Sequence, residues 1–239
     1  MKKTKLSVFT LCAALVLSGC SSMNNKTKGG LIGTGSGAAL GSLIGGLAGK
    51  GKGAAIGAAV GAAVGAGAGV LIGNRMDKAK AAAEEIESAQ VETVTDNNGL
   101  QAVKVTFDSG ILFATGDATL STSAKAALSK FAANVLSKNT DMDVAIQGYT
   151  DNQGWKNSTA EQSRQKNIDL SQVRAQSVQS YLLSCGVASS QIKSVEGLGE
   201  ANPVASNDTK EGQQQNRRVE VYLYASQAMI EAAENGTLK

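Results

Sequence analysis

Glycine recurs at every fourth position through a long segment of this 239-residue chain. The repeat runs from Gly33 to Gly73, and Ala, Leu, Ile and Val fill most of the positions between the glycines. Four-residue spacing places successive glycines on nearly one face of a helix, where two backbones can approach closely. A flexible Gly/Ala-rich spacer is the alternative, but random composition would not maintain this period. The repeat therefore favours packed helices.

The sequence Lys-Gly-Lys at residues 50–52 divides the repeat into apolar segments 31–49 and 53–73. Their lengths are close to the roughly 20 residues that span a membrane. We expect a helical hairpin over residues 31–73 with its two glycine faces packed together. Each interior glycine costs a helix about 0.5–1 kcal/mol relative to Ala, so close packing or lipid must offset that loss. Homo-oligomerisation through the same face is equally compatible with the pattern, and membrane insertion stays open.

The first 19 residues have the pattern of a secretory signal: early lysines, an apolar run over residues 6–17, and small residues before Cys20. The ending Leu-Ser-Gly-Cys resembles a bacterial lipobox. This resemblance implies cleavage before Cys20, acylation of that cysteine with palmitate among its chains and, from Ser21 at the next position, sorting to the outer membrane. Several acyl chains, each contributing about 0.8 kcal/mol per buried methylene, would anchor the chain stably. The alternative is ordinary cleavage that leaves Cys20 as a free thiol.

Removal of the signal leaves 20 basic and 20 acidic residues, because three of the 23 Lys and Arg residues precede Cys20. The near-neutral balance gives no argument for nucleic acid as a partner. The chain has no histidine, so a Ser-His-Asp triad, a Cys-His pair and a histidine-containing zinc site are absent. Cys185 is expected to be a buried small hydrophobe at a helix end. We expect no cofactor, no metal and no catalytic residue.

Composition divides the rest of the chain into three parts. Residues 20–30 form a flexible linker after Cys20, and residues 74–90 form a charged, Ala-rich segment that predicts a solvated helical stalk. The stalk would be about 25 Å long at about 1.5 Å per residue. Residues 91–239 form a domain large enough for one hydrophobic core, with its boundary near Val91.

Hydrophobic periodicity in this domain alternates between the two-residue period of strands and the longer period of helices. The elements expected are a β-hairpin from strands 91–95 and 100–107, a helix from Ser121 or Ser123 to Leu136, a strand over 142–147, a helix over 170–185, strands over 192–198 and 217–224, and a short docked helix within 226–239. Strands that alternate with helices require crossover connections and some parallel pairing. The fold class is therefore α+β, with two helices packed on a mixed sheet.

Charged residues stand at the ends of several of these elements. Asp151 follows a strand in Gly-Tyr-Thr-Asp, Arg174 lies in Leu-Ser-Gln-Val-Arg-Ala on a helix, and Arg217 opens the last strand in Asn-Arg-Arg. A carboxylate and a guanidinium held a ligand's length apart match a ligand that carries both an ammonium and a carboxylate. The alternative is a purely structural role, in which Asp151 and Arg174 pair with each other or cap helices. For an isolated Asp and Arg this alternative is the better prediction.

Together with Gly-Leu-Gly-Glu at residues 197–200, these motifs make residues 103–224 resemble the OmpA-like C-terminal domain, a family that includes peptidoglycan-associated lipoproteins and flagellar stator proteins. The resemblance implies noncovalent binding of peptidoglycan through the diaminopimelate of its stem peptide. It assigns Asp151 to the ligand's ammonium and Arg174 to its carboxylate. The remaining residues that it places at or near the ligand are Asn167, Thr115, Gly116, Asn216 and Arg217.

Two features depart from the family pattern. Asp151 and Arg174 are 23 residues apart, longer than usual by about two helical turns. The extra residues, 155–166, form either a lid that carries the only Trp over the ligand or a solvated surface loop. The loop is slightly favoured, because surface loops tolerate insertions. Ala114 also stands where the family often has Asp after Phe.

We therefore expect a lipoprotein of the outer membrane whose domain faces the periplasm and ties that membrane to the cell wall. One rival function is that of a wall hydrolase, which needs two carboxylates at a defined separation. Asp151, Glu161 and Asp169 are candidates for these carboxylates only because they lie near one another in the sequence. Another rival is a glycine-zipper oligomer or pore that the C-terminal domain positions on the wall.

Overall fold

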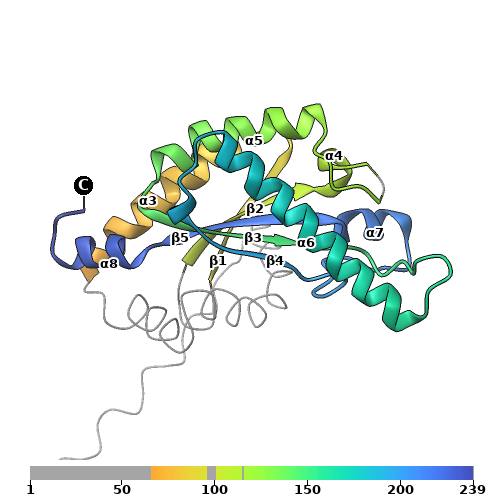
Figure 1. Ribbon diagram of the computed structural model, residues 1–239. Helices are drawn as coiled ribbons and strands as arrows, with labels where there is room; N and C mark the ends of the chain where they lie inside the picture. The colour runs from red at the N-terminus through yellow and green to blue at the C-terminus, as the bar shows by residue number, and fades with distance from the viewer. Residues whose placement is uncertain (1–65, 96–100, 115, 239) are drawn as a thin grey trace, which may run out of the picture. The chain divides into compact units, whose positions relative to one another are not determined.

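The computed structural model describes residues 66–95, 101–114 and 116–238 (Figure 1). The signal segment, Cys20, the linker over residues 20–30, Thr115 and most of the glycine repeat lie outside the described residues. The predicted hairpin over residues 31–73 is described only from Ala66 onward. Within the described ranges, no helix is both long enough and apolar enough to cross a membrane.

A five-stranded mixed sheet forms the centre of the fold, with strand order β1-β2-β5-β3-β4. The strands are β1 (Ala89–Thr95), β2 (Gln101–Asp108), β3 (Met142–Gly148), β4 (Ile192–Gly197) and β5 (Arg218–Ala225). All neighbouring pairs are antiparallel except β3 and β4, which run parallel. The parallel pair follows from the long crossover that returns the chain to the same edge of the sheet.

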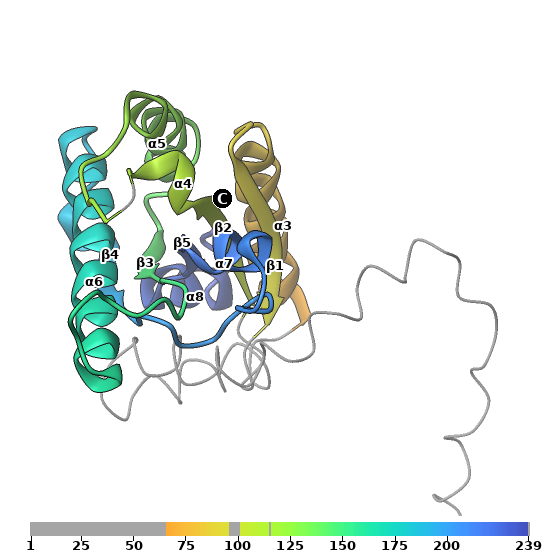
Figure 2. The same ribbon diagram turned by 90° about the vertical axis from the view of Figure 1, so that its right-hand side faces the viewer.

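The helices are α3 (Ala66–Glu84), α4 (Ser109–Leu112), α5 (Thr122–Asn134), α6 (Ala160–Ser184), α7 (Lys210–Asn216) and α8 (Gln227–Glu234), with short 3-10 turns at Leu136–Lys138 and Ser189–Gln191. The three longest of these, α3, α5 and α6, cover one face of the sheet (Figure 2). Alternate residues of β5, including Val219, Val221 and Leu223, pack with the helices in a single hydrophobic core. The predicted α+β class with helices on a mixed sheet is confirmed, with α3 as an additional helix in the same layer.

Helix α3 packs on the domain, where the sequence predicts a solvated stalk. Its buried residues, Ala68, Ile72, Met76, Ala79 and Ala83, recur every three or four positions and belong to the same core as the sheet. The Arg75 Nη2 donates to Asp141 Oδ2 at 2.6 Å and ties the helix to the turn before β3. Small alanines allow this close approach, so the folded unit begins well before Val91.

The last glycines of the repeat do not mediate close packing within the described residues. In α3, a Cβ added at Gly69 or Gly73 would meet no described atom within 4 Å. The neighbouring Val70 and Leu71 are exposed. The predicted contact between two glycine faces therefore stays a prediction for the part of the repeat outside the described ranges.

Helix α6 begins ten residues before the predicted start and takes up part of the insertion over residues 155–166. Thr159 caps the helix, because its hydroxyl accepts from Gln162 N while the Gln162 side chain accepts from Thr159 N. This reciprocal arrangement is a capping box, which satisfies two backbone donors at a helix start. The insertion is therefore neither wholly loop nor wholly lid: its second half lengthens α6.

Two further predictions concern the C-terminal helix and Cys185. The docked C-terminal helix is confirmed as α8, whose Met229, Ile230 and Ala233 are buried. The expected burial of Cys185 is wrong, because this thiol is free and exposed at the end of α6. Cys185 is the C-cap of α6, and Gly186 at φ +90° ends the helix directly after it.

Two glycines allow α6 to lie directly on the sheet. A Cβ on Gly148 of β3 would stand 2.2 Å from the carbonyl oxygen of Ser171, and one on Gly197 of β4 would stand 2.1 Å from the amide nitrogen of Gln172. Both clashes are with helix backbone, which cannot move as a single side chain could.

We expect Gly197→Ala to destabilise the domain by about 1–3 kcal/mol or more, because α6 must shift away from β4. Urea unfolding of the full chain measures the change. Gly73→Ala is the matched control in an uncrowded helix, where Ala is expected to leave stability unchanged or raise it by up to about 1 kcal/mol. Equal effects of the two substitutions would contradict the close approach.

Candidate functional site

A pocket of about 400 Å³ lies where β2 and β3 end and β5 begins. Its lining includes Phe113, Ala114, Asp151, Asn167, Arg174 and Arg217. Parts of the chain more than 100 residues apart thus meet at one edge of the sheet, as the sequence motifs predict. The two guanidinium groups and the one carboxylate give this pocket both signs of charge.

Asp151 lies just after β3 and is 7% exposed. Its Oδ1 accepts from the backbone N–H of Gln153 at 3.1 Å, which fixes the turn after the strand. Its Oδ2 forms an ion pair with the Nη1 of Arg217. Asp151 therefore pairs with Arg217 rather than with Arg174, the partner considered from the sequence.

Arg217 is held at its other end by a chain of side chains. Its Nη2 donates to the Oε1 of Gln214 in α7, and the Nε2 of Gln214 donates to Asp108 Oδ1 at 2.7 Å. Asp108 in turn caps α4 by accepting from Gly110 N. The Arg217 side chain remains 31% exposed, so its pairing with Asp151 is in contact with solvent and can be exchanged.

Arg174 projects from the middle of α6 into the pocket and is 3% exposed. Its Nε donates to the carbonyl oxygen of Asp117 at 3.0 Å and its Nη2 to that of Ala114 at 3.4 Å, while the guanidinium lies 5.2 Å from the ring centre of Phe113. Burial, followed by the positive charge of Arg217, lowers the pKa of Arg174. Arg174 thus holds the loop around Ala114 in place and still presents its charge to the pocket.

Asn167 connects the insertion to the pocket. Its Nδ2 donates to the carbonyl oxygens of Asp151 at 3.5 Å and Gln153 at 3.2 Å. Its Oδ1 accepts from the indole Nε1 of Trp155 at 2.8 Å, and Lys166 Nζ lies 5.8 Å from the centre of the Trp155 ring. The first part of the insertion therefore forms a wall of the pocket, which the solvated-loop interpretation did not anticipate.

The other predicted residues divide between the pocket and its support. Gly116 lines the pocket with φ +72°, a conformation that L side chains rarely adopt. Asn216 is buried outside the pocket lining: its Oδ1 accepts from Val204 N and Ala205 N, so it supports the loop before α7. Thr115 lies outside the described residues.

Sequence reasoning missed several polar residues of this pocket: Ser109, Thr150, Gln153, Lys156 and Gln214 all line it. Thr150 stands inside the Gly-Tyr-Thr-Asp motif, so its position beside Asp151 was a signal that could have been used. Ser109 gave no such signal, because only the sheet register brings it beside Arg217. Gln214 lies three residues before Arg217 in α7, so its contact with Arg217 is local. Within the described ranges, no cluster of three or more His, Cys, Asp and Glu residues is suited to a metal ion.

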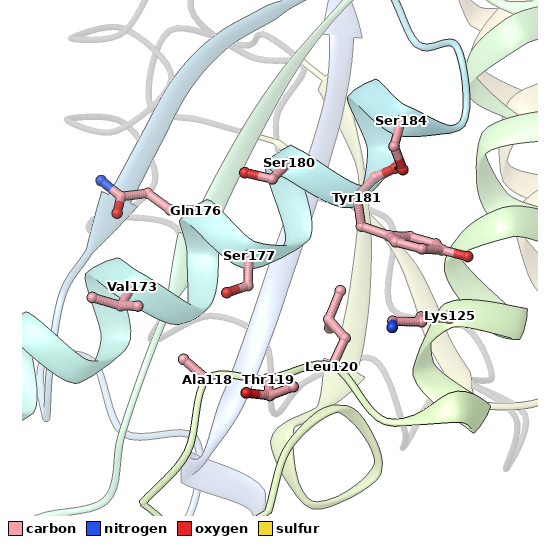
Figure 3. Close-up of a pocket in the computed structure, with 10 residues that line it drawn as sticks. All are labelled: Ala118, Thr119, Leu120, Lys125, Val173, Gln176, Ser177, Ser180, Tyr181 and Ser184. Atoms are coloured by element: carbon pink, nitrogen blue, oxygen red, sulfur yellow. Dashed lines mark hydrogen bonds between the residues drawn. The ribbon is translucent and has the colours of Figure 1, made fainter.

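A second, more open hollow of about 470 Å³ lies between residues 118–125 and the second half of α6. Figure 3 shows Thr119, Leu120 and Lys125 across from α6 residues that include Ser177 and Ser180. None of the predicted site residues that the structure describes lines it. The charged pocket is therefore the candidate site.

Comparison with known proteins gives two family matches and several relatives. Residues 112–217 match the sequence model of the OmpA family, and residues 1–77 match that of the YMGG-like Gly-zipper. The probable lipoprotein YiaD of Escherichia coli K12 is 46% identical over 91 residues, which cover 38% of this chain and 37% of YiaD. The peptidoglycan-binding protein ArfA of Mycobacterium tuberculosis H37Rv is 48% identical over 83 residues, which cover 35% of this chain and 23% of ArfA.

A solved structure shares the fold. The crystal structure of a MotB-like protein from Desulfovibrio vulgaris superposes with a TM-score of 0.55 at 22% identity, and the match covers 66% of this chain and 99% of that one. The matched segments span little more than a third of YiaD and about a quarter of ArfA. The chain therefore carries an OmpA family domain over residues 112–217, together with a YMGG-like glycine-zipper segment over residues 1–77.

Proposed function

We propose that this protein is a lipid-anchored envelope protein that binds peptidoglycan noncovalently and ties the outer membrane to the cell wall. The observation that carries the proposal is the single pocket in which Asp151, Arg174 and Arg217 meet. The names of ArfA, a peptidoglycan-binding protein, and YiaD, a probable lipoprotein, support it. Binding occurs without turnover, and Cys20 carries the lipid.

The ligand is the diaminopimelate of the stem peptide, whose free end bears an ammonium and a carboxylate. Asp151 accepts hydrogen bonds from the ammonium, and Arg174 meets the carboxylate. The ammonium displaces Arg217 from Asp151, an exchange that is favoured by the exposure of Arg217 to water. Charge-assisted hydrogen bonds contribute roughly 1.5–3 kcal/mol each, so one stem peptide binds with modest affinity.

Many weak contacts are sufficient for retention on the wall. The wall presents a dense array of stem peptides, and a lipid anchor keeps each domain close to it. Under these conditions the second and later binding events are effectively intramolecular, and the total avidity exceeds that of one site.

The test is sedimentation of the full chain, purified in mild detergent, with insoluble peptidoglycan of the diaminopimelate type and of the lysine type. We expect retention on the first and weak retention on the second, because lysine lacks the free carboxylate that Arg174 meets. Trp155, the only tryptophan, lines the pocket, so its fluorescence should respond to a diaminopimelate tripeptide. Failure to sediment with either wall, or release of wall fragments, would contradict binding without turnover.

A further inference from the structure

Two buried hydroxyl groups at the pocket have no hydrogen-bond partner among the described residues. Ser109 is 2% exposed and Thr150 is 5% exposed, and both residues line the pocket. Within the part of the chain that the structure describes, neither the Ser109 Oγ nor the Thr150 Oγ1 forms a hydrogen bond. Buried polar groups are almost always satisfied, and leaving one unsatisfied destabilises a fold. A pair of such groups in a single pocket therefore points to a partner that arrives with a ligand.

The sheet places both hydroxyls beside Arg217. Ser109 N donates to the carbonyl oxygen of Arg217 at 2.9 Å from the end of β2, and Tyr149 N donates to that of Arg218 at 2.9 Å from the end of β3. These bonds continue the registers that pair Asp108 with Arg218 and Gly148 with Val219. Ser109 and Thr150 are thus the lateral neighbours of Arg217 on either side, and neighbours across a sheet point to the same face.

The three residues form a row of hydrogen-bond donors at the start of β5. A hydroxyl can donate or accept, whereas a guanidinium only donates, so an oxygen acceptor with negative charge satisfies all three groups. The surrounding acceptors are already engaged: Asp151 pairs with Arg217, and Asp108 accepts from Gln214. Among the residues that the structure describes, Asp151 is the one carboxylate that lines the pocket. The acceptor must therefore come from the ligand.

We propose that Ser109 and Thr150 are ligand-binding residues that donate to the carboxylate beside the ligand's ammonium. This inference rests on the proposed function and adds a specificity for the free carboxylate over its amide. A carboxylate accepts up to about four hydrogen bonds, so the hydroxyls act together with Arg174. When the ammonium takes Asp151, the Arg217 side chain moves and opens the row to the carboxylate.

The test compares Ser109→Ala and Thr150→Val in the full chain. Ser109→Ala removes the hydroxyl, and Thr150→Val replaces it by a methyl group of similar size. The probe is an Ala-Glu-diaminopimelate tripeptide, either with its free carboxylate or with that group amidated, and binding is followed by calorimetry and Trp155 fluorescence. The control is Ser180→Ala on the outer side of α6, where the hydroxyl is exposed to water (Figure 3).

We expect each pocket variant to bind the free-carboxylate tripeptide about tenfold more weakly than the wild type, as for loss of one hydrogen bond to a charged group. The wild type should bind the amidated tripeptide more weakly than the free-carboxylate tripeptide. The affinities of the wild type and the variants for the amidated tripeptide should differ by no more than about twofold. The melting temperature of the free protein should stay the same or rise by roughly 2–4 °C, because an unsatisfied buried hydroxyl is gone.

Unchanged affinity in both variants, with a wild type that binds, would overturn this inference alone. A fall in melting temperature with unchanged affinity would also overturn it, because the hydroxyls would then have a structural partner such as water. A wild type that binds neither the tripeptide nor the wall would overturn the proposed function, and this inference with it. The Ser180→Ala control is expected to match the wild type in both measurements.

Discussion

Replacing Asp151 by Asn is expected to lower affinity for a diaminopimelate tripeptide by about 10- to 100-fold, and retention on peptidoglycan with it. The substitution keeps the shape of the side chain and removes the charge that faces the ligand's ammonium. Loss of one charge-assisted hydrogen bond corresponds to roughly 1.5–3 kcal/mol, which is the origin of this range. Binding of the tripeptide by calorimetry and sedimentation with the wall measure the two effects.

The same substitution should leave the fold intact. It breaks the Asp151–Arg217 pair, but the Arg217 side chain is already partly in water, and such pairs contribute about 1 kcal/mol or less. Asp169→Asn is the matched control, since Asp169 is an exposed carboxylate on the same helix as Arg174 and lies outside the pocket lining. If both variants lose binding equally, net charge rather than the pocket governs retention. If neither loses it, Asp151 does not contact the ligand.

Replacing Glu220 by Gln is expected to reduce the free energy of unfolding by about 3–5 kcal/mol at pH 7. Glu220 is 2% exposed on β5. Its Oε1 accepts from Arg218 Nε at 2.8 Å and lies 3.7 Å from Lys104 Nζ, and its Oε2 accepts from Tyr222 OH at 2.5 Å. The substitution leaves the buried Arg218 without its anion, while Lys104 keeps its ion pair with Glu92, and an uncompensated buried cation costs far more than loss of a surface pair. Urea denaturation measures the change.

The pH dependence follows from the direction of the pKa shift. Burial by itself raises the pKa of Glu220, but the charges of Arg218 and Lys104 and the hydrogen bond from Tyr222 outweigh burial and lower it. A carboxyl whose pKa is lower in the folded state stabilises the fold above its unfolded pKa of about 4.3 and loses that contribution as the pH falls through the folded pKa. The stability difference between wild type and Glu220→Gln should therefore be constant from about pH 6 to 8 and shrink in acid.

Glu161→Gln is the control for this prediction. Glu161 forms a surface pair with Arg164 at 3.5 Å within α6, and its side chain is 85% exposed. Surface pairs of this kind contribute at most about 0.5 kcal/mol. A Glu220 variant as stable as this control would show that the buried charges are satisfied by other groups.

Local patterns in the sequence were sufficient for the architecture. Alternation along Val219, Val221 and Leu223 and the longer period of the helices predicted a mixed sheet with helices packed on it, because these periods reflect which side chains are buried away from water. The sequence predicted a cap at Ser121 or Ser123, and Ser121 caps α5. These features depend on neighbours a few residues away, so one sequence is enough to identify them.

The same local patterns could not predict features that depend on packing between distant segments. The run of Ala, Lys and Glu over residues 74–90 has the composition of a solvated helix, yet Met76, Ala79 and Ala83 pack against the core. Alanine is compatible with both environments, so composition could not separate them. Similarly, the insertion contained the capping box at Thr159, a local signal for the early start of α6 that the sequence analysis did not use.

The sequence by itself determined which charged residues stand at the ends of the strands and helices, and so which residues could reach a zwitterionic ligand. Only the tertiary structure decided how they pair: the register of β5 between β2 and β3 places Arg217 against Asp151 and leaves Ser109 and Thr150 on either side of it. Element ends follow from local periodicity, whereas side-chain partners follow from a register that residues more than 60 positions apart establish through the shared core.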